Sequence, residues 1–283
     1  MASQREIRRR IGAVRNIKQI TRAMQFVAAS KLKRAQGATL SARPYSEKID
    51  EVLADLAAVL GADDHPLLAE REGGRRLLLV MTSDRGLAGP LNTNTIRFAA
   101  RDITANRDDL AVVSVGRKGR DAMRRARVPI VAHFDAFGDR PTFADALPLA
   151  RLVTDEFVSG KANRVDILYS RFESTLVQRP TLERLLPVEP AEDTAGIPGN
   201  QFIFEPSPAA VLERMLPRYV AARIFQAVLE ANASFFSSQM VAMKNATENA
   251  EELIDDLTLS YNKVRQANIT REMIEIASGA QAR

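Results

Sequence analysis

The feature that most limits the possible fold is a stretch near the C-terminal end with a single strong helix breaker. Ser207 and Pro208 are a typical N-cap and first helical residue, and from there to about Ser278 only Pro217 interrupts the pattern. A continuous helix of some 70 residues would be on the order of 100 Å long. No compact domain can enclose such a helix, so we expect it to project from the globular part.

The same stretch contains seven-residue spacing, which is typical of a left-handed coiled coil and requires a partner helix. The two series are Met243, Ala250, Leu257, Val264 and Thr247, Ile254, Tyr261, Asn268. The N-terminal segment is the natural partner. Its apolar residues recur at close to helical spacing and predict a second long amphipathic helix: Ile7, Ile11, Val14, Ile17, Ile20, Met24, Val27, Leu32.

Charge predicts how the two helices align. Of the 40 basic and 35 acidic residues, ten basic and one acidic lie in residues 1–36, which leaves a balance of −4 for the remainder. An antiparallel register would place Arg8–Arg15 against the acidic run Glu248–Asp256, with Arg10 beside Leu253. The N-terminal helix would then end near Ser260. The last ~20 residues would project as a single helix whose apolar side chains need a cover from outside the chain.

Residues 75 to 185 have a different character. Short aliphatic runs (RRLLLVM, LAVVSVG, VPIVAHF, RVDILYSR) alternate with helical patterns (LNTNTIRFAARDITA, GRDAMRRA, TFADALPLARLVTDEF). This alternation predicts a mainly parallel sheet covered by helices. We expect a loop at EDTAGIPGNQ and a short strand at QFIFE. The predicted domains are a helix over 1–60 that breaks near Pro44 and resumes with Ser46 as N-cap, an α/β domain over 75–205, and the long helix over 207–283.

Composition excludes several classes of site. The chain has no cysteine and two histidines, His65 and His133, without a neighbouring nucleophile or carboxylate cluster, so we expect no catalytic residues, no cofactor and no metal. No apolar run approaches the roughly 20 residues of a membrane span. The turn Thr82–Asn92 follows a strand and precedes a helix, as phosphate-binding turns do, but it lacks their glycine and lysine spacing. We interpret it as a tight turn.

The basic N-terminal helix leaves other functions open. Its charge is sufficient to bind nucleic acid, and it could also lie on an anionic membrane surface. Phe26 is its only aromatic residue, however, and it has neither a stacking platform nor a recognition motif. A free-standing coiled-coil adaptor or nucleic-acid-binding protein therefore remains the alternative function.

Four blocks, in order, resemble the gamma subunit of bacterial F-type rotary ATP synthases. They are EIRRRIGAVRNIKQITRAMQFVAASKLKRA, LVMTSDRGLAGPLN, FEPSP, and the segment from MVAMKNATENAEELIDDL to the C-terminal end. The resemblance implies an antiparallel coiled coil with an inserted Rossmann-like domain. It implies a non-catalytic rotating shaft that couples ion flow through a membrane c-ring to ATP synthesis or hydrolysis at catalytic beta subunits. The expected partners are three alpha and three beta subunits, epsilon and the c-ring.

The resemblance also implies roles for individual residues. Contacts with beta subunits are expected from Met24, Lys31, Lys33, Arg34, Arg265, Gln266 and Thr270. Contacts with the c-ring are expected from Phe202, Phe204 and Glu205, and the axle tip carries Ile269, Met273, Ile274 and Ile276. The expected location is peripheral, on the cytoplasmic face of the bacterial cell membrane.

The chain departs from the family pattern at three points. Gln239 stands near a position where some relatives have arginine, Ala88 replaces a usual cysteine, and a regulatory cysteine pair is impossible. The start at the shaft helix, without a presequence, favours a bacterial source.

Overall fold

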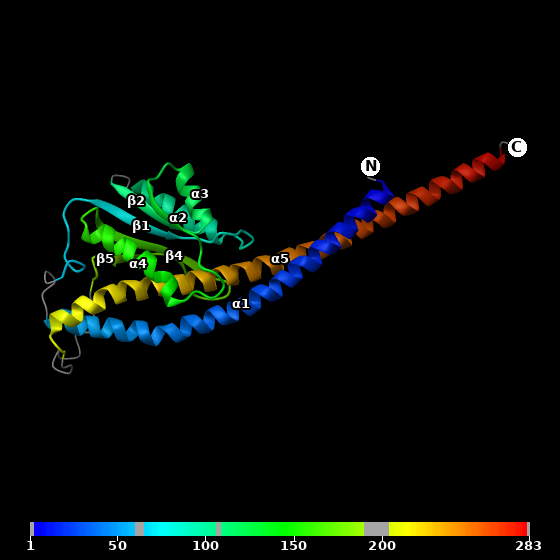
Figure 1. Ribbon diagram of the computed structural model, residues 1–283. Coiled ribbons are helices and arrows are strands. Elements are labelled where there is room, and N and C mark those ends of the chain that lie inside the picture. Colours follow the sequence, from blue (N-terminus) through cyan, green and yellow to red (C-terminus); the bar gives the residue numbers. More distant parts are fainter. Residues whose placement is uncertain (1–2, 60–64, 106–108, 190–203, 282–283) are drawn as a thin grey trace. The chain divides into compact units, whose positions relative to one another are not determined.

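The computed structural model describes residues 3–59, 65–105, 109–189 and 204–281. They divide into two compact units, one formed by residues 1–28 with 239–283 and the other by residues 29–238. Helices α1 and α5 contribute to both units (Figure 1). The elements are α1 Gln4–Val59, β1 Arg75–Met81, α2 Leu91–Ala105, β2 Leu110–Val115, α3 Arg117–Arg125, β3 Ile130–Phe134, α4 Phe143–Val158, β4 Ala162–Phe172, β5 Gln178–Leu186 and α5 Pro208–Gln281.

Helix α1 is continuous through Pro44, so the predicted break near that residue is wrong, and Ser46 lies inside the helix instead of capping a new one. A proline within a helix removes one hydrogen bond and costs about 3 kcal/mol. Here Leu40, whose carbonyl loses its donor, is exposed, and water can bond that carbonyl. Burial of Ile49 and Leu53 one to two turns further on offsets the cost by holding the helix against the core.

Helix α5 begins as predicted. The Ser207 hydroxyl accepts a hydrogen bond from the Ala210 N–H at 3.3 Å, and Pro208 is the first helical residue. The helix continues through Pro217, because the neighbouring Leu216 and Val220 are fully buried in the core and hold both sides of the interruption. The whole element has 74 residues.

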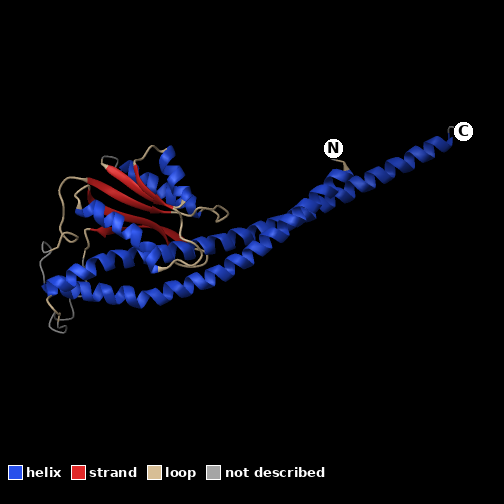
Figure 2. Cartoon of the chain, viewed as in Figure 1, coloured by secondary structure: helices blue, strands red, loops and turns tan. Residues whose placement is uncertain are grey.

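The sheet has five strands in the order β3-β2-β1-β4-β5 (Figure 2). The first four are parallel and match the four predicted strands, whereas β5 pairs antiparallel with β4 and was missed. Its sequence, QRPTLERLL, is polar and contains Pro180, which favours a turn. Proline is tolerated there because β5 lies at the edge of the sheet. The predicted loop EDTAGIPGNQ and the first three residues of the short strand QFIFE lie outside the described residues, and the last two, Phe204 and Glu205, are not in a strand.

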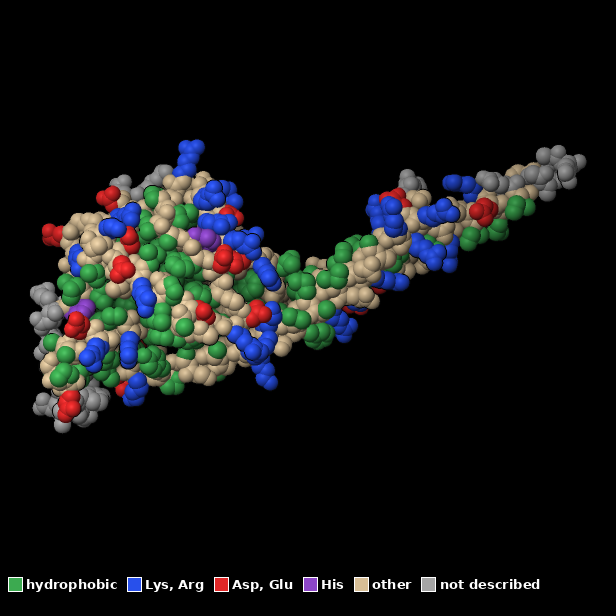
Figure 3. Space-filling view, in the orientation of Figure 1, with side chains coloured by type: hydrophobic (Ala, Val, Ile, Leu, Met, Phe, Trp, Pro, Cys, Tyr) green, Lys and Arg blue, Asp and Glu red, His purple; other side chains and the backbone are tan. Residues whose placement is uncertain are grey.

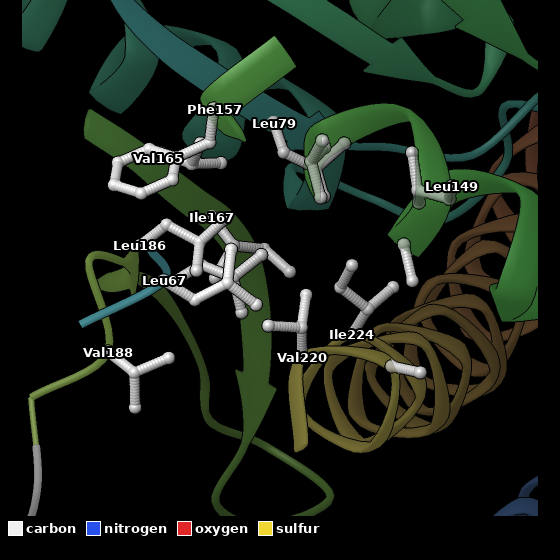
Figure 4. Close-up of a cluster of buried hydrophobic side chains, with 14 of the residues drawn as sticks. Leu67, Leu79, Leu149, Phe157, Val165, Ile167, Leu186, Val188, Val220 and Ile224 are labelled. Atoms are coloured by element: carbon white, nitrogen blue, oxygen red, sulfur yellow. The ribbon is translucent and has the colours of Figure 1, made fainter. Parts of the chain in front are cut away.

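Alternate residues of β1 enter two different cores. Leu77, Leu79 and Met81 face a large core shared with α4 and the parts of α1 and α5 in this unit, while Leu78 and Val80 face a smaller core under α2 and α3. Figure 4 shows the larger core, in which side chains from β4, α4 and α5 converge. This doubly covered parallel sheet confirms the predicted α/β fold. The division of the sequence at 1–60, 75–205 and 207–283 stays a proposal.

A buried charged cluster joins β1, β4 and α2. Asp166, which is fully buried, accepts hydrogen bonds from Arg76 and, at 2.9 Å, from Arg164, and Arg76 also donates to Asp102 at 2.7 Å. Burial alone would lower the pKa of Arg76, but the charges of Asp166 and Asp102 outweigh it and raise that pKa. Arg76 therefore stays charged and neutralises Asp166 inside the protein.

An Arg76→Met variant is expected to lose about 3 kcal/mol of unfolding free energy, because Asp166 would keep only one of its two cationic partners. Urea unfolding followed by circular dichroism would measure this. Arg97→Met is a suitable control, because Arg97 lies on α2 and is exposed. Equal losses in both variants would contradict the role given to the cluster.

Candidate partner-binding surfaces

The helical unit is an antiparallel pair whose register is fixed by three contacts. Lys18 donates to Glu251 at 2.7 Å, the Thr247 hydroxyl donates to that of Thr21 at 2.8 Å, and Gln4 donates to the Tyr261 hydroxyl at 3.1 Å. The two seven-residue series of α5 lie along this pair as far as Tyr261, with Met243 and Ala250 buried and the others partly buried, whereas Val264 and Asn268 follow the last contact. The predicted antiparallel coiled coil is therefore confirmed.

The predicted charge register is wrong by about one helical turn. Lys18, and not the segment Arg8–Arg15, reaches the acidic run, and Arg10 pairs with Glu6 on its own helix at 2.6 Å. Exposed ion pairs are too weak to impose a register against apolar packing. Ile7 and Ile11 are both buried, and their packing sets the alignment instead. The expected end of the N-terminal helix near Ser260 agrees with the contact between Gln4 and Tyr261.

The Lys18 ammonium lowers the pKa of Glu251 through its hydrogen bond and its charge. A lowered carboxyl pKa stabilises the folded pair above the ordinary pKa of glutamate, and this contribution is lost as the pH falls through the lowered value. In a Lys18→Met variant we expect the pKa of Glu251 to rise toward its ordinary value, measured by NMR titration of the side-chain carboxyl carbon. Gln19→Met, one residue away and exposed, should leave it unchanged.

The helical tip, residues 262–281, extends beyond the contact with Gln4. Its predicted apolar residues are all exposed, from 48% for Ile269 through 61% for Ile274 and 64% for Met273 to 73% for Ile276. Arg265 and Gln266 are also exposed, and the Thr270 hydroxyl donates to the Gln266 carbonyl at 3.0 Å. An isolated helix with this composition is marginal in water, so the tip is a surface for a partner.

A second exposed apolar surface runs along α1. Ile17, Ile20 and Val27 are each more than half exposed, and Met24 beside them is partly buried. The apolar residues of α1 do not all lie on one buried face. The face that packs against α5 passes through Lys18, Thr21 and Ala28, and successive steps of three residues carry the apolar series away from that face. Figure 3 shows hydrophobic and basic side chains interspersed on the surface of the helical unit.

The remaining residues expected to contact beta differ in accessibility. Lys33 and Arg34 are exposed, whereas Lys31 pairs with Asp139 at 2.6 Å and is largely buried. Of the expected c-ring contacts, Phe204 is partly buried against the larger core, Glu205 is exposed, and Phe202 lies outside the described residues.

The turn after β1 uses its polar groups internally. The Asp84 carboxylate accepts hydrogen bonds from the first N–H of α3, at Arg117, at 2.9 Å and from the Ala136 N–H at 3.2 Å. Ser83 and Asn92 bond each other across the turn at 2.8 Å. The polar side chains of the turn are therefore bonded to the turn itself, to the start of α3 and to the segment after β3, which agrees with a tight structural turn.

A serine cluster that sequence reasoning missed fastens α5 to three loops and strand ends. Ser234, Ser237 and Ser238 donate hydrogen bonds to the carbonyls of Ser170 at 2.8 Å, Thr175 at 2.7 Å and Ala88 at 2.6 Å. Small side chains allow the helix to approach the ends of β1 and β4 closely. The signal in the sequence was three serines within five residues of a predicted helix interior, where serine is unfavourable unless it has a partner.

The described residues form neither a metal-binding cluster nor a membrane-spanning helix. Among them, no group of three or more histidine, aspartate or glutamate side chains is arranged to hold a metal ion. None of the helices, as far as they are described, combines the length and apolar character needed to span a membrane.

The fold and surfaces define a class of protein: one chain that combines an antiparallel helix pair with an exposed apolar tip and a doubly covered α/β unit. A family model described as ATP synthase matches residues 3–282. ATP synthase gamma chains of Dehalococcoides mccartyi and Roseiflexus castenholzii are each 48% identical, over 100% of this chain and 99% of theirs. The chain therefore belongs to the ATP synthase gamma chain family.

Solved structures with lower identity share the fold. A chain in the mitochondrial ATP synthase of Euglena gracilis (OSCP/F1/c-ring, rotational state 3) superposes with a TM-score of 0.71 at 21% identity, covering 99% of this chain and 94% of that chain. A rotor chain from the same organism gives 0.67 over 94% of this chain.

Proposed function

We infer that this chain is the central rotating shaft of a bacterial F-type ATP synthase and has no catalytic residues of its own. One observation carries the inference: the helical tip leaves Ile269, Met273, Ile274 and Ile276 exposed beyond the last contact with α1. A ring of alpha and beta subunits around the tip would remove this apolar surface from water. Family membership supports the same assembly.

The mechanism follows from the asymmetry of the helical unit. Its exposed α1 stripe and its polar residues Arg265 and Gln266 lie on different parts of the surface, so three surrounding beta subunits would each meet a different set of side chains. Rotation would then favour a different conformation at each catalytic site, by the difference in contact free energy between the conformations. We assign the beta contacts to Met24, Lys33, Arg34, Arg265, Gln266 and Thr270.

A segment of the α/β unit is assigned to the membrane motor. Phe202, Phe204 and Glu205 are the proposed c-ring contacts, and epsilon is a further proposed partner. The location that follows is peripheral, on the cytoplasmic face of the cell membrane. The driving force would be hydrogen ion transport through the ring.

The test is co-expression with the matching alpha and beta subunits, followed by size exclusion and an ATPase assay with and without this chain. The expected result is a complex with three alpha, three beta and one copy of this chain, whose hydrolysis depends on the chain. A chain that elutes alone and binds DNA or RNA in a salt-sensitive manner would overturn the proposal and favour the nucleic-acid-binding alternative.

A charge reversal tests the beta contacts separately. Lys33→Glu is expected to lower the ratio of protons pumped to ATP hydrolysed several-fold while leaving the melting temperature of the isolated chain within about 2 °C, because Lys33 is exposed. Lys118→Glu reverses an exposed lysine of α3 as a control. An unchanged pumping ratio in Lys33→Glu would remove this residue from the mechanism.

A further inference from the structure

The bridging loop, residues 135–141, connects β3 to α4 and is fixed at its first end by the α/β unit. The Ala136 N–H donates to Asp84 at 3.2 Å, and the Phe137 side chain packs against the larger core. The loop is therefore part of the α/β framework at this end.

The far end of the same loop contacts both long helices. Asp139 pairs with Lys31 of α1 at 2.6 Å, and the Gly138 carbonyl accepts a hydrogen bond from Asn232 of α5 at 3.2 Å. The Lys31 ammonium also lies 5.4 Å from the ring centre of Phe236 of α5, a cation–π distance. Lys31 thus has a charge partner and an aromatic partner inside the chain, and its side chain is only 24% exposed.

We propose that Lys31 is an internal positioning residue that fastens the bridging loop to α1 and α5, and that it does not contact a beta subunit. The geometry supports this because Lys33 and Arg34, the neighbouring basic residues, are exposed and available to a partner, whereas Lys31 is directed to Asp139. Under the shaft function, the loop would keep the parts of α1 and α5 in this unit fixed to the α/β framework when load is applied. This last consequence rests on the proposed shaft function, but the contact itself does not.

Hydrogen exchange of the isolated full-length chain tests the contact without any partner. Lys31→Ala and Asp139→Asn should each raise the exchange rate of amides in residues 135–141 by about three- to fivefold, the effect of losing one favourable ion pair. The charge swap Lys31→Asp with Asp139→Lys should recover at least half of the lost protection. Lys33→Ala, two residues along the same helix, should leave these amides unchanged. Unchanged exchange in Lys31→Ala, or no recovery in the swap, overturns the proposal.

The charge swap also gives a second, functional test. In the assembled complex, Lys31→Ala is expected to lower the pumping ratio, and the swap Lys31→Asp with Asp139→Lys should restore it at least in part. The swap rebuilds the internal ion pair but reverses the charge that a partner would meet at position 31. Recovered protection of the loop in the free chain without recovery of the pumping ratio would mean that Lys31 acts through a partner. Failure of assembly itself would refute only the shaft function, since the exchange result is obtained on the free chain.

Discussion

A Gly116→Ala variant is expected to lose about 4 kcal/mol of unfolding free energy, more than any other single substitution considered for the α/β unit. Gly116 lies between β2 and α3 with φ 85° and ψ 144°, a conformation that residues with a Cβ rarely adopt. An added Cβ would also lie 2.1 Å from the Thr82 carbonyl oxygen. Backbone atoms cannot move aside as a flexible side chain can, so the ends of β1 and β2 must separate.

Thermal and urea unfolding of the isolated chain would measure this loss. Gly86→Ala is the matched control: Gly86 lies in the neighbouring turn, and an added Cβ there meets nothing within 4 Å. We expect the control to change stability by less than about 0.5 kcal/mol. A Gly116→Ala variant as stable as the control would show that the turn can shift without loss.

Truncation after Tyr261 is expected to abolish most of the coupling between ATP hydrolysis and pumping while leaving the rest of the chain folded. The removed residues include the four exposed apolar side chains of the tip, whereas the contacts of Gln4, Lys18 and Thr21 with α5 are all retained. Circular dichroism should therefore show a loss of helix in proportion to the residues removed and an unchanged midpoint for the remainder.

A matched variant separates the role of the tip surface from that of its length. Replacing Ile269, Met273, Ile274 and Ile276 with glutamine keeps the helix but removes its apolar surface, and it should reproduce most of the coupling defect. If the truncated chain unfolds, the tip stabilises the coiled coil after all. If the glutamine variant couples normally, the apolar side chains are not what the ring contacts.

The parts of the fold that the sequence predicted were those with a strong local pattern. Strands β1 and β2 are buried aliphatic runs, and α2 has the predicted bounds, because in both cases burial in the α/β unit imposes a regular spacing. Strand β5 was missed since an edge strand tolerates Pro180 and polar residues, which locally favour a turn. The break near Pro44 was predicted wrongly because tertiary packing of α1 overrides the local cost of proline.

The candidate surfaces were predictable to different extents. The exposed tip was predictable from the lengths of the two helices. A helix that continues past the end of its partner helix has no neighbour to cover its apolar side chains. The contact of Lys31 with Asp139 joins residues more than 100 positions apart, and no local spacing in the sequence predicts such a contact. The predicted register of the coiled coil was wrong for a related reason. The register depends on which apolar side chains interdigitate, and the pattern of charges along the sequence does not determine this.

The Asp84 carboxylate has a consequence for the edge of the sheet at which β1, β2 and β3 end. It accepts hydrogen bonds from the N–H groups of Arg117, the first residue of α3, and Ala136, which follows β3. One side chain from the turn after β1 therefore holds the segments after β2 and after β3. A change at Asp84 would release both segments at once, although neither is adjacent to it in the sequence.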